Sequence, residues 1–303
     1  MNLVIFDDAL FHLLRLTRVV NSPSGNILLV GVGGSGKQSL TKLAAFIVKH
    51  VFFQISLTKT YNDNNLKDDI KELYRFAGPM GQQVTFIMTD AEIKSETFLE
   101  AINSMLATGE IPGLIPKDEK DVISLECKTV YQKEMGGGKG QEPSLLDLWV
   151  YFINRVKDCL HTVLAFSPVG TKFRERSQKF PSLFSSCSID WFLPWPEDAL
   201  VAVSQKFLTG FKIDCTPEIL ANLEKHMGKC HDLVTEVCDI YFQRMRRHVY
   251  VTPKSYLSFI DLYKDVYKVK YDGIDVEEAN IVSGLEKLAE ASQGVEELKV
   301  ISE

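Results

Sequence analysis

The sequence of 303 residues lacks the features that mark membrane, disulfide-stabilised and nucleic-acid-binding proteins. No run approaches the roughly 18 apolar residues of a membrane span, and no Cys-x-x-Cys pair occurs among the six cysteines, which favours reduced thiols. Acids outnumber bases to give a net charge of −6, which disfavours a broad surface for nucleic acid or anionic lipid. Asp7 and Asp8 stand where a signal peptide is basic. We therefore expect a soluble intracellular protein that binds neither nucleic acid nor membrane.

What the sequence does contain is a phosphate-loop pattern at residues 27–41. An apolar run that predicts a strand ends at Gly31, and a glycine-rich stretch leads to Lys37 and a helical pattern. Glycines let backbone N–H groups turn onto phosphate oxygens, and a lysine on the first helical turn adds charge beside the helix N-terminus. A simple glycine-rich turn is the alternative. The spacing favours a nucleotide site made by Gly31, Val32, Gly33, Gly34, Ser35, Gly36, Lys37, Gln38 and Ser39.

The motif departs from its usual form at the position that binds Mg²⁺. Gln38 replaces the expected hydroxyl, and Ser39 lies one residue further on, about 100° around the helix. A metal ion would have to be held by Ser39 and by an acid at the end of a later strand, for which Asp90 is the candidate.

Apolar runs and helical patterns alternate through the first part of the chain, which predicts a parallel sheet flanked by helices. After residues 27–30, strands are expected at 51–57, 84–88, 162–166 and 188–192, with helices at 3–20, 65–77, 96–106 and 145–160. Residues 110–145 form the least regular part, and the glycine run at 136–140 is expected to be a flexible surface loop.

From residue 194 onward the pattern is mainly helical, so we place a domain boundary there. Helices are expected at 197–208, at 217–249 with an interruption near Gly228, and at 253–271. From Ile281 the apolar residues follow a three-four spacing that predicts the start of a coiled coil, with a solvated terminal helix as the alternative. The pattern is still running at Glu303, as it would in a fragment.

Taken in this order, the elements resemble an AAA+ module over nearly the whole chain. Four matches are similar, more narrowly, to the fourth AAA+ module of dynein heavy chains: residues 31–40, residues 98–100 with 108–114, residues 191–196 and residues 252–260. The resemblance implies an α/β fold with a five-stranded parallel sheet, a smaller all-α lid and the outgoing helix of the microtubule-binding stalk. It assigns residues 1–193 to the large nucleotide-binding subdomain, 194–272 to the lid and 273–303 to the stalk.

The resemblance also implies roles for single residues. Lys37 would bind the outer phosphates, and Ser167 would fill the polar sensor position after the fourth strand. Lys254 could serve as the sensor of the lid, where the family usually has arginine. Val4 and Phe6 are candidates for the adenine pocket.

The acidic strand end fits the family less well. In one register Thr89 replaces the metal-binding aspartate and Asp90 stands where the catalytic glutamate belongs. In the other, Asp90 is the metal ligand and Ala91 replaces the base. Glu92 could compensate only by reaching back from the next turn.

A further departure concerns the arginine that the family often directs at the neighbouring module's site. Ser186 occupies its place, while Arg174 and Arg176 lie close by without matching it. These departures are more like axonemal than cytoplasmic dyneins.

Together these features imply a ring module of a dynein motor that binds ATP or ADP, with weak or absent Mg²⁺, and hydrolyses little of it. The implied partners are neighbouring AAA+ modules of the same heavy chain, other dynein chains and a microtubule reached through the stalk. The implied location is the cytoplasm, the cytoskeleton and the axoneme of the cilium. An autonomous P-loop ATPase or kinase and a structural spacer with a relict site remain as alternatives.

Overall fold

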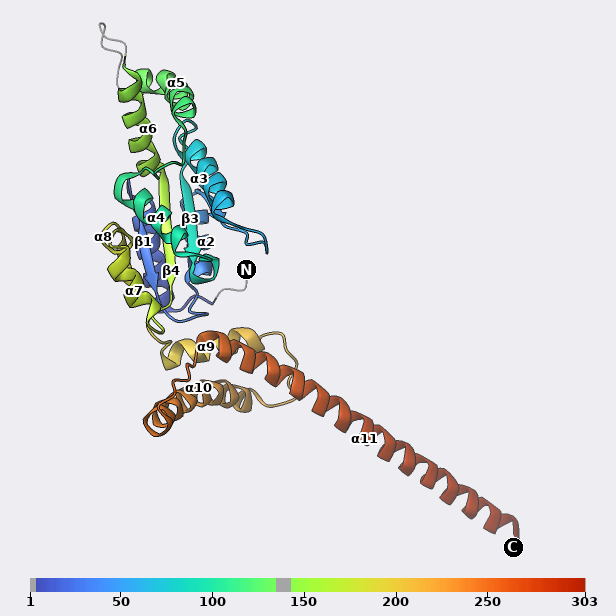
Figure 1. Ribbon diagram of the computed structural model, residues 1–303. Coiled ribbons are helices and arrows are strands. Elements are labelled where there is room, and N and C mark those ends of the chain that lie inside the picture. The colour runs from blue at the N-terminus through green and yellow to red at the C-terminus, as the bar shows by residue number, and fades with distance from the viewer. Residues whose placement is uncertain (1–3, 135–142, 303) are drawn as a thin grey trace. The chain divides into compact units, whose positions relative to one another are not determined.

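The computed structural model describes residues 4–134 and 143–302. The chain forms two compact units, Met1–Ala199 and Leu200–Glu303 (Figure 1). Within the described ranges, no helix combines the length and the apolar character needed to cross a bilayer. The predicted surface loop at residues 136–140 lies outside the described residues.

The first unit is built on a five-stranded, fully parallel sheet, as the sequence predicts. The strand order is β2-β3-β4-β1-β5. All residues of β1, β3 and β4 are buried, because helices cover both faces of the sheet and continuous apolar runs fill its centre. The strands are β1 (Ile27–Val30), β2 (Val51–Gln54), β3 (Val84–Thr89), β4 (Leu160–Phe166) and β5 (Ser188–Trp191).

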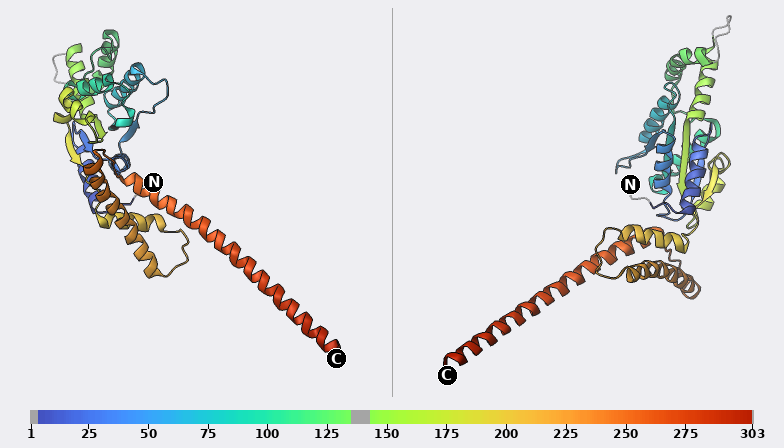
Figure 2. Two further views of the ribbon diagram at one scale, coloured as in Figure 1. Left: turned by 60° about the horizontal axis from the view of Figure 1, so that its bottom comes forward. Right: turned by 180° about the vertical axis from the view of Figure 1, so that it is seen from behind.

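Helices form a layer on each face of this sheet (Figures 1 and 2). Alternate residues of β1 point to opposite faces, so Ile27 and Leu29 join one core cluster while Leu28 and Val30 join the other. The first cluster contains side chains of α1 (Asp7–Val20) and α2 (Lys37–Ile47). The second is formed with α3 (Asp63–Ala77), α4 (Glu96–Thr108) and α6 (Leu145–Cys159), and the short α8 (Ser182–Ser185) adds Leu183.

The prediction that residues 110–145 are irregular is wrong for much of that range. Lys117–Glu134 form an 18-residue helix, α5. This helix is rich in charged residues but also has a narrow apolar stripe, in which Ile123 and Cys127 are buried. Tyr131 packs edge-to-face on Tyr151 of α6, with ring centroids 5.2 Å apart. The sequence pattern also missed the short helix α7 (Lys172–Lys179), which buries none of its residues fully.

The second unit contains the end of α9 (Glu197–Leu208), together with α10 (Pro217–Met245) and α11 (Pro253–Ser302). The predicted interruption of α10 near Gly228 is wrong, because the helix runs through it. Gly228 is instead a contact site, where a Cβ atom would lie 3.4 Å from Leu200 Cβ. The buried Tyr256 of α11 donates a hydrogen bond to the carbonyl oxygen of Leu200 at 2.9 Å, which joins α9 to α11.

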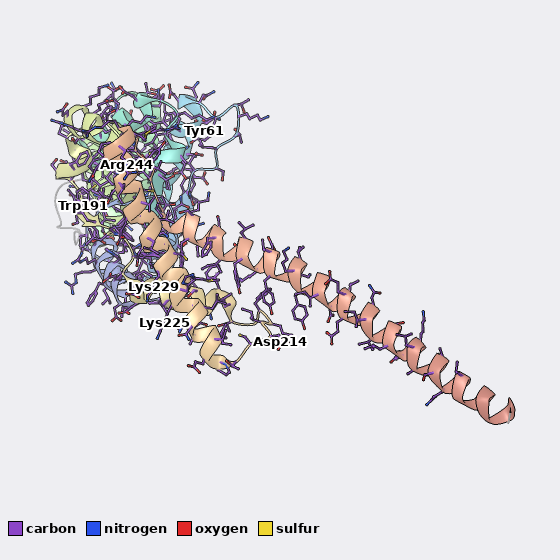
Figure 3. All side chains as sticks on the ribbon, turned by 90° about the horizontal axis from the view of Figure 1, so that it is seen from below. Tyr61, Trp191, Asp214, Lys225, Lys229 and Arg244 are labelled. Carbon is purple, nitrogen blue, oxygen red and sulfur yellow. The ribbon has the colours of Figure 1, made fainter. Side chains whose placement is uncertain are left out.

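Helix α11 continues well beyond the predicted end at residue 271. Its side chains from residue 271 to residue 293 are all exposed. Figure 3 shows the side chains along the part of α11 that extends away from Asp214. Ile274, Ile281, Leu288 and Val295 recur every seventh residue and are each more than half exposed. Such a stripe is typical of the seam of a coiled coil, and its side chains are left exposed by the described residues.

We expect this exposed part of α11 to fray in the isolated chain. Helices without a packing partner are marginal in water, so amide protons beyond about residue 285 should exchange quickly. Hydrogen exchange followed by mass spectrometry measures this, with residues 253–262 as the internal control, because Tyr256 and Ile260 are buried there. Strong protection as far as Val300 in the monomeric chain would contradict the expectation.

Candidate functional site

The loop between β1 and α2 has a shape that only glycine allows at several positions. Gly34 and Gly36 have φ angles of +84° and +92°, in the left-handed region that side chains disfavour. Gly31 meets a different constraint, since a Cβ atom there would lie 2.6 Å from Phe192 Cβ. At Gly33, none of the described residues lies within 4 Å of such an atom, so this side of the loop is open there. The loop is therefore a backbone cradle at a helix N-terminus, which suits a phosphate group.

Lys37, the first residue of α2, lies folded over this loop. Its Nζ atom donates hydrogen bonds to the carbonyl oxygens of Gly31 at 2.6 Å and Val32 at 2.8 Å, and to Ser35 Oγ at 3.1 Å. Burial lowers the pKa of Lys37 to about 8, although the negative charge of Asp90 opposes the shift. A partly desolvated cation beside a helix N-terminus is stabilised by an incoming anion.

The end of β3 carries the acidic residues, held in a short turn formed by Asp90–Glu92. Asp90 uses both carboxylate oxygens: Oδ2 accepts a hydrogen bond from the backbone N–H of Ser167 at 2.6 Å, and Oδ1 forms an ion pair with Arg176. Ser167 thus lies beside Asp90 through its backbone, while its hydroxyl accepts from the N–H of Val169 at 3.4 Å. The structure brings Lys37, Asp90 and Ser167 to one end of the sheet.

Glu92 does turn back toward the strand end, but its oxygens are already occupied. Oε1 accepts from Gln54 Nε2 and Oε2 accepts from the N–H of Thr89, both at 2.7 Å. Burial raises the pKa of Glu92, and the two hydrogen bonds and the charge of Lys42 offset part of that effect. In this arrangement Glu92 closes the turn after β3 and ties it to β2.

Arg176 is the residue of this site that the sequence analysis did not place beside Asp90. It belongs to α7 and is separated from Asp90 by 86 positions in the sequence. Its guanidinium lies over the Phe166 ring, 5.1 Å from the ring centre, which is within the range of a cation–π contact. The only available sequence signal was that two arginines, Arg174 and Arg176, follow the fourth strand.

The residues present fit phosphate better than they fit a protein-held Mg²⁺. No group of three or more His, Cys, Asp or Glu side chains is arranged for a metal in the part of the chain that the structure describes. Gln38 is exposed and Ser39 is half-buried on the first turn of α2. The Thr89 hydroxyl is buried without a hydrogen-bond partner among the residues that the structure describes, so its oxygen is available as a ligand at the strand end. Metal binding by Ser39 and Asp90 therefore stays a prediction.

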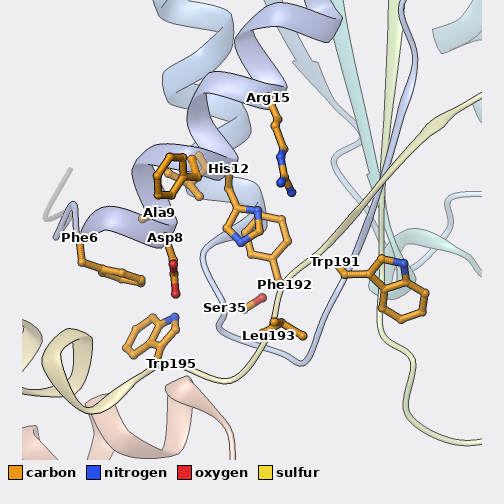
Figure 4. A pocket seen from close by; sticks show the side chains of 12 residues that line it. Phe6, Asp8, Ala9, His12, Arg15, Ser35, Trp191, Phe192, Leu193 and Trp195 are labelled. Atoms are coloured by element: carbon orange, nitrogen blue, oxygen red, sulfur yellow. The ribbon is translucent and has the colours of Figure 1, made fainter.

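A pocket of about 220 Å³ opens beside the phosphate loop (Figure 4). Phe6 and Trp195 face each other there in an edge-to-face arrangement, with centroids 5.6 Å apart, and Ser35 of the loop contributes to the wall. Val4, the other candidate for contact with adenine, is half-buried but does not line this pocket. The pocket offers aromatic surface next to the phosphate cradle.

Two residues of α1 fix the wall of the pocket through a buried carboxylate. His12 Nδ1 and Arg15 Nη1 lie 2.7 Å and 2.8 Å from the oxygens of Asp190 in β5, whose side chain is 2% exposed. Burial alone would raise the pKa of Asp190, but these hydrogen bonds outweigh it and lower that pKa. His12 also stacks on Phe192, with ring centroids 3.9 Å apart. The hydrogen bonds of His12 and Arg15 to Asp190 join α1 to β5.

Lys254, the candidate lid sensor, belongs to the second unit. It lies on the first turn of α11 with its side chain exposed. Its proposed part in nucleotide chemistry stays a prediction.

A parallel sheet with a phosphate loop after β1, an acidic turn after β3 and a polar residue after β4 defines an AAA+ type P-loop module. Residues 1–266 match the family described as P-loop containing dynein motor region D4, and the chain belongs to that family.

The chain is similar along nearly its whole length to axonemal and flagellar dyneins. It is 52% identical to "Dynein axonemal heavy chain 5" of Rattus norvegicus over 295 residues. These residues are 97% of the chain and 8% of that relative. Identity to "Dynein axonemal heavy chain 8" of Homo sapiens is 50% over 300 residues, 98% of the chain and 7% of the relative. Identity to "Dynein gamma chain, flagellar outer arm" of Chlamydomonas reinhardtii is 46% over 303 residues, which is 99% of the chain and 6% of the relative. The chain thus spans less than a tenth of these relatives.

Proposed function

We propose that this chain is a nucleotide-binding AAA+ module of an axonemal dynein motor, which binds ATP or ADP at the phosphate loop and hydrolyses it slowly. The observation that carries the proposal is the glycine cradle beneath Lys37. Gly31 is packed against Phe192, and Gly34 and Gly36 hold left-handed conformations that a relict loop would have no reason to keep. This counts against a purely structural spacer.

Within this proposal Lys37 and the loop from Gly31 to Ser39 bind the phosphates, while Phe6 and Val4 contact the adenine. Ser167 and Lys254 act as sensors of the phosphate end, and Mg²⁺, when present, is held weakly. Residues 194–272 form the lid, and residues 273–303 begin the stalk, which suits the exposed seven-residue stripe of α11.

The partners follow from the same reading. Neighbouring AAA+ modules of one heavy chain would flank this module in a motor ring, other dynein chains would assemble with it, and the stalk would lead to a microtubule. The expected localisation is the ciliary or flagellar axoneme, since the relatives named above are axonemal and flagellar dyneins.

Co-purified nucleotide gives the direct test. The chain, denatured by heat after purification, should release about one ADP or ATP per molecule, identified by mass. An empty preparation that also fails to bind added ADP in calorimetry would favour the structural spacer with a relict site.

The lowered pKa of Lys37 predicts that ADP binding weakens in alkaline buffer. In the protein without nucleotide, the pKa of the Lys37 side chain is about 8. A bound phosphate favours the charged form of Lys37 and raises that pKa. Binding must therefore take up a proton above about pH 8, and affinity should fall about tenfold between roughly pH 7 and pH 9. Calorimetry across this range measures the slope.

Lys37→Arg is the matched control for this pH dependence, because its guanidinium stays charged throughout. We expect a flat profile for that variant. Equal slopes for both proteins would show that another group controls the titration.

A further inference from the structure

Arg176 holds the carboxylate that a hydrolytic site would need free. Its Nη1 atom is paired with Asp90 Oδ1, and Oδ2 of the same carboxylate accepts the N–H of Ser167 at 2.6 Å. The Arg176 side chain is only 15% exposed and rests on the ring of Phe166, so the pair is fixed from two sides. Asp90 is 36% exposed. A partly buried guanidinium held by packing and by charge keeps its geometry better than a surface lysine would.

The pair changes what Asp90 offers to a metal ion. A free carboxylate next to bound phosphates attracts Mg²⁺ and can orient a water. The ion pair that Asp90 forms with Arg176 carries no net charge, and a dication approaching the carboxylate also meets the positive guanidinium. The neighbouring acid cannot substitute, because both oxygens of Glu92 are engaged by Gln54 and by the N–H of Thr89.

We propose that Arg176 is a positioning residue that locks Asp90 away from the metal and water positions of the nucleotide site. The lock acts within this chain and needs no neighbouring module. Together with Gln38 in place of the metal-binding hydroxyl, it makes nucleotide binding nearly independent of Mg²⁺. This inference rests on the proposed binding of nucleotide by the phosphate loop.

The test compares ADP affinity in excess Mg²⁺ with ADP affinity in excess EDTA, by calorimetry on the 303-residue chain. For the unmodified chain we expect the two values to agree within about twofold. Arg176→Gln removes the charge and keeps a polar side chain, so Asp90 is released and Mg²⁺ should strengthen ADP binding by about tenfold or more. Arg176→Lys keeps a cation beside Asp90 and should restore the Mg²⁺-independent behaviour.

Arg174→Gln is the matched control, since Arg174 is exposed on the same helix and loses the same charge. It should behave like the unmodified chain. A change of general stability, followed by thermal unfolding, would shift affinity equally in both buffers, whereas the lock predicts a change in their ratio.

Three results would overturn the proposal. The first is an unmodified chain that already binds ADP about tenfold more tightly with Mg²⁺, which is decisive even if Arg176→Gln does not fold. The second is an Arg176→Gln variant whose ratio stays near that of the unmodified chain. The third is an Arg176→Gln variant that unfolds at the same temperature as the unmodified chain yet loses affinity equally in both buffers, which would make Arg176 a phosphate ligand. Absence of ADP binding in every condition would instead refute the nucleotide site itself.

Discussion

Replacing Lys37 by alanine is expected to weaken the binding of ATP or ADP by about thirtyfold or more. A charge-assisted hydrogen bond contributes on the order of 2 kcal/mol, and a factor of ten in affinity corresponds to about 1.4 kcal/mol. Lys37 is the cation that lies over the phosphate loop, with its Nζ atom 2.6 Å from the Gly31 oxygen. Titration calorimetry with ADP measures the loss.

Lys42→Ala provides the matched comparison. Lys42 is on the same helix and carries the same charge, but it is exposed and lies 5.4 Å from the centre of the Phe52 ring, away from the loop. Its replacement should change ADP affinity by less than about twofold. If Lys37→Ala binds ADP as the unmodified chain does, the phosphate-loop assignment fails.

The second large effect concerns turnover. Hydrolysis of ATP needs a held metal ion, an oriented water and positive charge near the leaving phosphates. Here Gln38 stands in place of the metal-binding hydroxyl and Asp90 is paired with Arg176. The loss of one positioned catalytic group commonly costs about a hundredfold or more, and such losses need not multiply.

We therefore expect the chain to bind ATP but to turn it over at less than about 0.01 s⁻¹, against the order of 1 s⁻¹ for a competent enzyme. A single-turnover assay with excess protein measures the rate, and Lys37→Ala prepared in parallel reports contaminating activity. A rate near that of competent enzymes would show that Asp90, Glu92 or Ser39 performs the missing roles. It would also favour an autonomous ATPase.

The phosphate loop could be predicted because its determinants are contiguous. Gly31, Gly36 and Lys37 lie within one strand-loop-helix unit, and the chemistry of each depends on the backbone next to it. The same locality explains why α4 and α6 were predicted close to their observed bounds. Helix α5 was missed because its stabilising contacts come from α6, which lies further along the chain.

The predicted interruption of α10 failed for a related reason. Gly228 was interpreted from local propensity alone, as a residue that weakens a helix. In the folded chain the helix runs through Gly228, which packs near Leu200 at a distance where a Cβ atom would make ordinary van der Waals contact. The sequence contains the glycine, but not the identity of the residue that packs against it.

By itself, the sequence determined the α/β class, the position of the phosphate cradle and the family, because each follows from short-range spacing or from matched stretches. Only the tertiary structure decided how the acidic residues at the end of β3 are used. Arg176 lies 86 positions from Asp90 and Gln54 lies 38 positions from Glu92, yet each occupies an oxygen of its partner. Side-chain pairing across such separations depends on how α7 and β2 pack around β3, and no local pattern encodes that packing.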